Sequence, residues 1–106
     1  MKTHPWLTTL LFCCALPTQA DGLPAARQQE LTHFVRQECG FCHGLKLTGG
    51  LGSSLTAEAL KNKPAETLIP AILYGIPGTA MPGWLPYLSE ADTRWIVDKL
   101  LKGFPE

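Results

Sequence analysis

The sequence has no excess of charge of either sign and no cluster of basic residues. Its 106 residues carry 9 Lys and Arg against 9 Asp and Glu, and 17% of the chain is charged. A nucleic-acid-binding surface and a polybasic membrane-binding segment both need concentrated positive charge, so we expect neither. The length predicts one small domain.

The sequence also lacks an apolar run long enough to cross a membrane. Its longest largely apolar stretch, residues 6–16, has 11 residues, about half of what a membrane-spanning helix requires. Lys2 precedes this stretch and the small residue Ala20 follows it, which is the layout of a secretory signal peptide. We therefore expect residues 1–20 to be cleaved, residues 21–106 to form the mature domain, and the protein to be periplasmic without stable membrane insertion.

Export would leave a chain that is poor in thiols and short of core. Residues 21–106 number 86, with 8 basic and 9 acidic side chains, and they contain two cysteines, Cys39 and Cys42. So short a chain can bury only a limited core. The 10 glycines and 9 prolines of the sequence predict long irregular loops that something else must support.

No segment alternates polar and apolar residues as a half-buried strand does, so the sequence predicts an all-α domain of three to four helices and two long loops. The first helix is expected over residues 24–38, because proline suits a helix start, and it should end before Gly40. Its inward face is expected to carry Leu31, Phe34, Val35 and Glu38.

Two shorter helices are expected in the middle of the chain. Thr56 is a candidate cap for a helix over residues 57–60, and Thr67 for a helix over residues 68–74. Pro70 would then fall in the first turn of the latter, where its missing amide has no helical partner to lose.

The last helix has clear signals at both ends. Ser89 and Asp92 form a capping-box pattern with aspartate where glutamate is usual, and Gly103 follows the last turn. The expected apolar face consists of Ala91, Trp95, Ile96, Val97, Leu100 and Leu101.

The pattern that carries chemistry is Cys39, Cys42 and His43, a C-x-x-C-H arrangement that attaches a c-type haem. Two thiols at this spacing can each bond to one vinyl group of a porphyrin, while the adjacent imidazole reaches the iron. We therefore predict one haem c, bound covalently through Cys39 and Cys42, with His43 as the proximal iron ligand. The haem would supply the missing core.

The same residues could serve in three other kinds of site. A thioredoxin-like pair would begin a helix after a strand, whereas this pair follows a helix. A zinc site needs four ligands, and only His33 on the preceding helix remains as a fourth. A disulfide would close a very small loop and leave His43 unexplained.

The sixth iron ligand would separate a carrier from a catalyst. Met81 is the only methionine after the predicted cleavage site, and it lies in the proline- and glycine-rich segment 75–86, away from any helical face. We predict Met81 as the distal iron ligand. A packing role for Met81, which would leave the iron open, stays as the alternative.

The motif Cys39-Gly-Phe-Cys42-His43, the segment 75–84 with Met81, and the final helix resemble the class I monohaem cytochromes c. The resemblance covers nearly all of residues 25–102 and implies the cytochrome c fold, with the first and last helices crossing near the haem. The crossing would bring Leu31 or Phe34 and Val35 against Trp95. Many relatives have a proline in the loop after the motif, whose carbonyl accepts a hydrogen bond from the proximal histidine. Ser53 stands there instead, so the acceptor is left open.

The shortness of the chain and the stretch 45–50 are similar to the small periplasmic cytochromes of the c55X type, which occur with the haem-d1-containing nitrite reductase of denitrifiers. With His43 and Met81 on the iron, no site remains for a substrate. The expected function is therefore one-electron transfer by a monomer, not an enzyme, in nitrite respiration. An apolar rim for docking redox proteins is expected to contain Phe41, Leu45, Ile76, Ala80 and Trp84.

Other roles stay open. Trp84 suits a core or haem contact as well as a docking rim. The resemblance also allows electron exchange with an enzyme that completes haem d1, in place of supply to nitrite reductase. A haem sensor or peroxidase-like protein with a labile Met81 bond is the third function.

Overall fold

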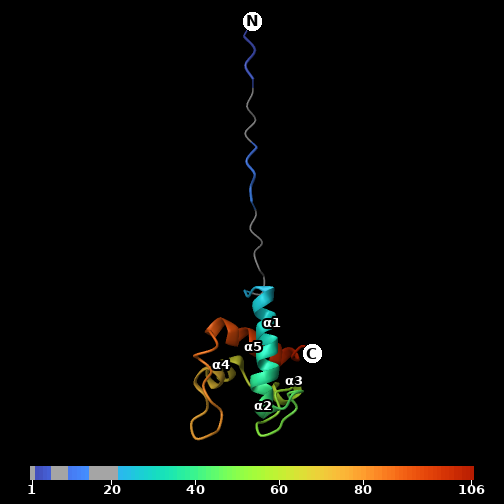
Figure 1. The fold of residues 1–106 in the computed structure, drawn as a ribbon, viewed down its shortest axis with the longest axis vertical. Coiled ribbons are helices and arrows are strands. Elements are labelled where there is room, and N and C mark those ends of the chain that lie inside the picture. The colour runs from blue at the N-terminus through green and yellow to red at the C-terminus, as the bar shows by residue number, and fades with distance from the viewer. Residues whose placement is uncertain (1, 6–9, 15–21) are drawn as a thin grey trace.

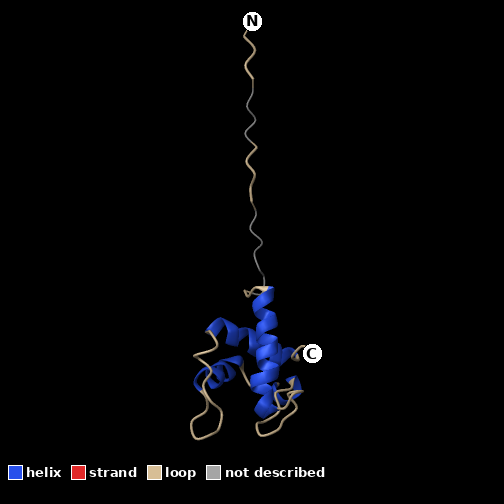
Figure 2. Ribbon diagram, in the orientation of Figure 1, coloured by secondary structure: helices blue, strands red, loops and turns tan. Residues whose placement is uncertain are grey.

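The computed structural model describes residues 2–5, 10–14 and 22–106, and every regular element within these ranges is a helix (Figures 1 and 2). The expected all-α class is thus confirmed. The predicted cleavage site after Ala20 lies outside the described residues. Leu10, Leu11 and Phe12, from the predicted signal peptide, are almost fully exposed. No helix among the described residues combines the length and apolar character needed to span a bilayer.

A single helical rod leads into the cysteine motif. It consists of α1 (Ala25–Phe34), the π-helical turn η1 (Val35–Cys39) and α2 (Gly40–His43). The prediction that the helix ends before Gly40 is wrong: Gly40 has helical angles, φ −61° and ψ −26°. The rod ends at Gly44 instead, where φ is +90°, a conformation that glycine adopts without steric penalty.

The π-helical turn changes which residues of the rod face inward. The Gly40 amide donates to the Val35 carbonyl, five residues earlier, in the wide turn of a π-helix. Val35 is buried on the inner side of this turn, whereas Glu38 is exposed. The expected inward position of Glu38 is therefore wrong, since a carboxylate without a buried partner favours water.

The middle helices differ in how well the sequence predicted them. Helix α3 (Ala57–Leu60) has the expected cap, because the Thr56 side chain accepts a hydrogen bond from the Ala59 amide. Helix α4 (Ala65–Tyr74) begins three residues earlier than predicted, with Pro64 rather than Thr67 before its first residue. Pro70 consequently lies inside the helix, where it removes the amide that would pair with the carbonyl four residues earlier.

The last helix, α5 (Glu90–Lys102), has the predicted capping box. Asp92 and Thr93 are buried, however, and Ala91 is exposed, which reverses part of the expected apolar face. Thr93 satisfies its hydroxyl locally by donating to the Ser89 carbonyl at 2.9 Å. A polar side chain whose hydrogen bonds are made can be buried at little cost.

The core lies where the first rod crosses α5 and where α4 packs on α5 (Figure 1). Leu31 and Val35 share one buried cluster with Trp95, as the helix crossing predicted. Phe34 packs against this cluster from a half-buried position. The buried apolar residues of the first cluster are Leu31, Val35, Leu47, Leu60, Leu88, Trp95, Ile96 and Leu100, and those of the second are Ile69, Leu73 and Val97.

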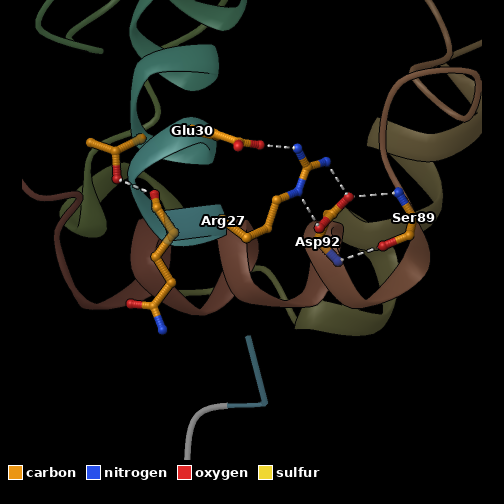
Figure 3. Close-up of polar contacts among 6 residues, drawn as sticks. Arg27, Glu30, Ser89 and Asp92 are labelled. Atoms are coloured by element: carbon orange, nitrogen blue, oxygen red, sulfur yellow. Dashed lines mark hydrogen bonds and ion pairs between the residues drawn. The ribbon is translucent and has the colours of Figure 1, made fainter. Parts of the chain in front are cut away.

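One ionic network joins the start of α1 to the start of α5 (Figure 3). Arg27 donates to both carboxylate oxygens of Asp92, at 3.1 and 2.7 Å, and to Glu30 at 2.8 Å. Asp92 also accepts from the Ser89 amide at 3.0 Å, so it completes the capping box and the ion pair together. The Arg27 guanidinium holds the pKa of Asp92 below its usual range.

Candidate functional site

The predicted ligands Cys39, Cys42 and His43 lie together at the end of the helical rod. All three are half-buried, and both thiols are free rather than joined in a disulfide. Burial, with a smaller effect from the neighbouring Glu38 carboxylate, raises the pKa of the Cys39 thiol to about 11. A redox-active dithiol works through a thiol of lowered pKa, so this site does not favour the thioredoxin-like alternative.

The zinc alternative also finds no support in the geometry. Within residues 2–5, 10–14 and 22–106, no three His, Cys, Asp or Glu side chains are grouped as metal ligands. His33 is exposed on α1. A structural zinc site would need four converging ligands.

His43 is held by the loop that follows it. Its Nδ1 lies 2.7 Å from the Ser53 carbonyl oxygen. Because a carbonyl oxygen can only accept, the proton sits on Nδ1, and Nε2 is left with its lone pair free for a metal. The acceptor that the sequence left open is therefore the backbone of Ser53, in the position where many relatives have proline.

The loop fits closely around the imidazole. The Gly52 amide donates to the Cys42 carbonyl at 2.7 Å, and the Gly49 amide donates to the His43 carbonyl at 2.8 Å. A Cβ atom added at Gly52 would lie 2.8 Å from the His43 ring. Glycine is needed here because the backbone approaches the ring more closely than any side chain would permit.

The second loop carries Met81 and folds back on the end of α4. The Trp84 amide donates to the Ile72 carbonyl at 2.9 Å, and the Ile76 amide donates to the Met81 carbonyl at 3.3 Å. A Cβ added at Gly75, where φ is +76°, would lie 2.7 Å from the Met81 carbonyl oxygen. Met81 itself is half-buried. In Figure 1 the loop of residues 44–56 lies beside α2, and the loop of residues 75–88 extends toward the same end of the domain before it returns to α5.

The predicted rim is largely solvent-exposed. Phe41 is 79% exposed and Leu45 is 72% exposed, and both belong to the segment around the cysteine motif. Ile76 and Ala80, on the second loop, are exposed as well. Trp84 differs, because it is half-buried and packs edge-to-face on Phe34 with ring centroids 5.3 Å apart. Of the roles left open for Trp84, the structure shows the contact with the core.

Sequence reasoning missed one residue near the motif, Arg36. Its guanidinium donates to the Leu45 carbonyl at 3.1 Å and to the Pro105 carbonyl at 2.6 Å, and it lies 5.4 Å from the centre of the Phe104 ring. These contacts link residues 9 and 69 positions apart in sequence. No local sequence pattern predicts the contacts of Arg36, because every residue type has a backbone carbonyl.

The residues present fit a haem c. A pair of free thiols precedes a histidine whose Nδ1 proton is held, and a glycine leaves room beside its ring. In combination with the all-α fold, this arrangement is typical of one class of protein, the c-type cytochromes.

Comparisons with known proteins agree with this class. The family model described as "Cytochrome C oxidase, cbb3-type, subunit III" matches residues 26–98. Cytochrome c55X of Pseudomonas aeruginosa is 53% identical over 100 residues, which are 92% of this chain and 84% of that protein. The chain therefore belongs to the cytochrome c55X family of c-type cytochromes. Members of this family carry haem c and are electron-transfer proteins, not enzymes.

Solved structures that are similar to this chain include a c-type cytochrome and a dehydrogenase. The c-type cytochrome NirC superposes with a TM-score of 0.74 at 51% identity, and the match covers 76% of this chain and 94% of that one. Dihydro-heme d1 dehydrogenase NirN, solved in complex with DHE, gives a TM-score of 0.64 at 32% identity. That match covers 70% of this chain but 16% of the dehydrogenase, so the likeness is to one part of a much larger protein.

Proposed function

We propose that this protein is a periplasmic one-electron carrier of nitrite respiration, with a single haem c bound covalently through Cys39 and Cys42 and ligated by His43 and Met81. The observation that carries this proposal is the 2.7 Å contact between His43 Nδ1 and the Ser53 carbonyl, directly beside two free thiols. It leaves Nε2 as the coordinating atom of the ring.

When bound, the haem supplies reversible one-electron exchange between ferrous and ferric iron. The protein contributes to this function by orienting the His43 imidazole and by keeping side-chain atoms away from its ring. Ser53 holds the proton of His43 on Nδ1, which keeps one tautomer and makes Nε2 a better donor. Gly52 keeps the space beside the ring free of side-chain atoms.

Met81 completes the proposed ligand set. Its thioether is a soft ligand that favours the ferrous state and raises the reduction potential relative to a second imidazole. The hydrogen bond from the Ile76 amide to the Met81 carbonyl, with the tight approach of Gly75, supports a loop of defined shape. A ligand held in this way would not leave the iron open to a substrate.

The proposed docking rim consists of Phe41, Leu45, Ile76 and Ala80, which are exposed around the two loops. Exposed apolar side chains of this kind suit a small, transient contact with another redox protein. The nearly balanced charge of the chain predicts modest electrostatic steering, and therefore a weak dependence of the association rate on salt.

Export is supported by the sequence of the first 20 residues and by the exposure of Leu10, Leu11 and Phe12, which leaves them free of packing contacts with the domain. The test is the mass of the protein recovered from the periplasm. We expect an 86-residue chain that begins at Asp21 and carries one haem. A mass without haem would contradict the proposed function.

The ligand set is tested by the visible spectrum of the same sample. A methionine bound to ferric haem gives a weak absorption band in the red, and a filled sixth position prevents carbon monoxide from binding the reduced protein at neutral pH. Persistent binding of carbon monoxide would instead favour a sensor or peroxidase-like protein.

A second candidate function is electron exchange during haem d1 maturation. The similarity to part of a dihydro-heme d1 dehydrogenase favours it, because the name of that protein says that it acts on dihydro-heme d1. A deletion strain separates the two functions. Loss of haem d1 from the cell would indicate maturation, whereas normal haem d1 with slow nitrite reduction would indicate electron supply.

A further inference from the structure

The side chain of Arg36 joins three segments that are separate in sequence. It projects from the π-helical turn η1, three residues before Cys39, and donates one hydrogen bond to the turn after His43 and one to the C-terminal tail. The acceptors are the carbonyls of Leu45, at 3.1 Å, and Pro105, at 2.6 Å. One planar guanidinium can span two carbonyls in this way because its donors form a rigid fork.

The tail end of this link is anchored on the core. Phe104 lies under the Arg36 guanidinium, 5.4 Å from its central carbon, and packs edge-to-face on Trp95 at 6.3 Å. Trp95 is buried in α5 at the helix crossing. Arg36 therefore ties the motif to a well-packed helix.

The other end of the link holds the turn 44–47, whose middle residues are exposed and whose last residue, Leu47, is buried in the core. The Leu45 side chain is 72% exposed, so it adds little packing. The turn closes through the Leu47 amide, which donates to the Gly44 carbonyl at 2.8 Å, and it leads into the loop that contains Ser53. The Leu47 carbonyl accepts from the Leu55 amide at 2.8 Å, so the turn is bonded to the segment that directly follows Ser53, the residue whose carbonyl holds His43.

We propose that Arg36 is a positioning residue for His43: by tying the turn at Leu45 to the C-terminal tail, it keeps the Ser53 carbonyl on the Nδ1 proton. The role rests on the proposed function, in which His43 ligates the iron. Hydrogen bonds from a charged group are stronger than neutral ones, so Arg36 adds a restraint at Leu45, on the exposed part of the turn. Both of these bonds are made to neutral backbone carbonyls. Arg36 belongs to none of the ion pairs among the described residues.

The test compares Arg36→Met and Arg36→Lys with Arg94→Met in the haem-loaded, reduced protein. Arg94 is the matched control, because it is an exposed arginine whose partner, Glu90, lies on its own helix. The measurements are exchange of the His43 Nδ1 proton and of the Leu47 amide by NMR. Lysine keeps the charge but has no rigid fork, so it separates charge from positioning.

We expect both Arg36 variants to exchange these two protons about tenfold faster, the factor that corresponds to one hydrogen bond to a charged group. Exchange of the Leu100 amide in α5 should stay unchanged, and Arg94→Met should change none of the three. Equal acceleration at Leu100 would mean general destabilisation and would overturn the proposal. Unchanged exchange at His43 and Leu47 would overturn it as well.

Truncation after Gly103 tests the tail. It removes Phe104 and Pro105, so the additional effect of Arg36→Met should shrink in the truncated protein. Additive effects would refute the link. The proposed function and this inference fail in different ways. If the proposed function is wrong, the wild-type protein carries no covalent haem. If only this inference is wrong, the protein carries haem and the Arg36 variants leave proton exchange at His43 and Leu47 unchanged.

Discussion

Removal of the Arg27 side chain should destabilise the fold far more than removal of a surface arginine. Asp92 has a side-chain exposure of 8%, so Arg27→Met leaves a buried carboxylate with only the Ser89 amide as partner. Breaking a fully buried ion pair in this way costs about 3–5 kcal/mol. Arg27 is itself 36% exposed, and solvent screening lowers the expected loss to about 1–3 kcal/mol.

The assay is urea unfolding of the reduced protein, with Arg94→Met as the control. The Arg94–Glu90 pair is exposed on both sides, so its loss should change the free energy of unfolding by about 0.5 kcal/mol or less. A cycle of Arg27→Met, Asp92→Asn and the double variant isolates the pair energy. Equal destabilisation by Arg27→Met and Arg94→Met would refute the reasoning.

The same pair predicts a pH dependence. Arg27 lowers the pKa of Asp92 in the folded protein below the ordinary value of 3.8, so the unfolded chain binds the proton more readily. The stabilisation is therefore complete above pH 3.8 and is lost as the pH falls through the folded-state pKa. Arg27→Met should flatten this acid limb in urea titrations, and an unchanged limb would contradict the assignment to Asp92.

The site allows four further predictions. Gly52→Ala should lower thermal stability and shift the haem absorption, because the added methyl would lie 2.8 Å from the His43 ring. Ser53→Pro should raise the free energy of urea unfolding by about 0.4–1 kcal/mol, since the Ser53 amide makes no backbone hydrogen bond within the described residues. Met81→Ala should abolish the red absorption band and let the reduced protein bind carbon monoxide. Phe41→Glu should slow electron transfer to the redox partner in stopped-flow assays without changing the reduction potential.

Each of these outcomes has a result that would count against it. An unchanged spectrum of Gly52→Ala would mean that the ring is not confined by the loop. A less stable Ser53→Pro would indicate that the backbone there does not suit proline. Retention of the red band in Met81→Ala would assign the sixth ligand to another residue, and unaltered transfer rates in Phe41→Glu would remove that side chain from the docking rim.

The ends of the helices show how far local sequence signals reach. The capping box of Ser89 and Asp92 was predictable because its partners lie three residues apart, and its hydrogen bonds form within one turn. The start of α4 was not, because Pro64 and Thr67 are both acceptable at a helix start. The longer helix brings Ala65 into contact with the buried cluster of α4 and α5, a contact that no local signal indicates.

The site divides in the same way. Cys39, Cys42 and His43 could be found from spacing alone, because haem attachment demands thiols and an imidazole within five residues. The contacts of Arg36 and the acceptor of the His43 proton could not, because both are backbone carbonyls brought near by folding. A carbonyl has no residue-specific signature.

The sequence by itself determined the all-α class, the c-type cytochrome family and the chemistry of the motif, since these depend on periodicity and on short, specific spacings. Tertiary structure alone decided that the helix runs through Gly40 to His43, that Asp92 is buried against Arg27, and that Ser53 holds the imidazole. The physical reason is distance along the chain. Contacts between residues far apart in sequence form only when burial of the core brings their segments together. Local sequence patterns therefore do not predict these contacts.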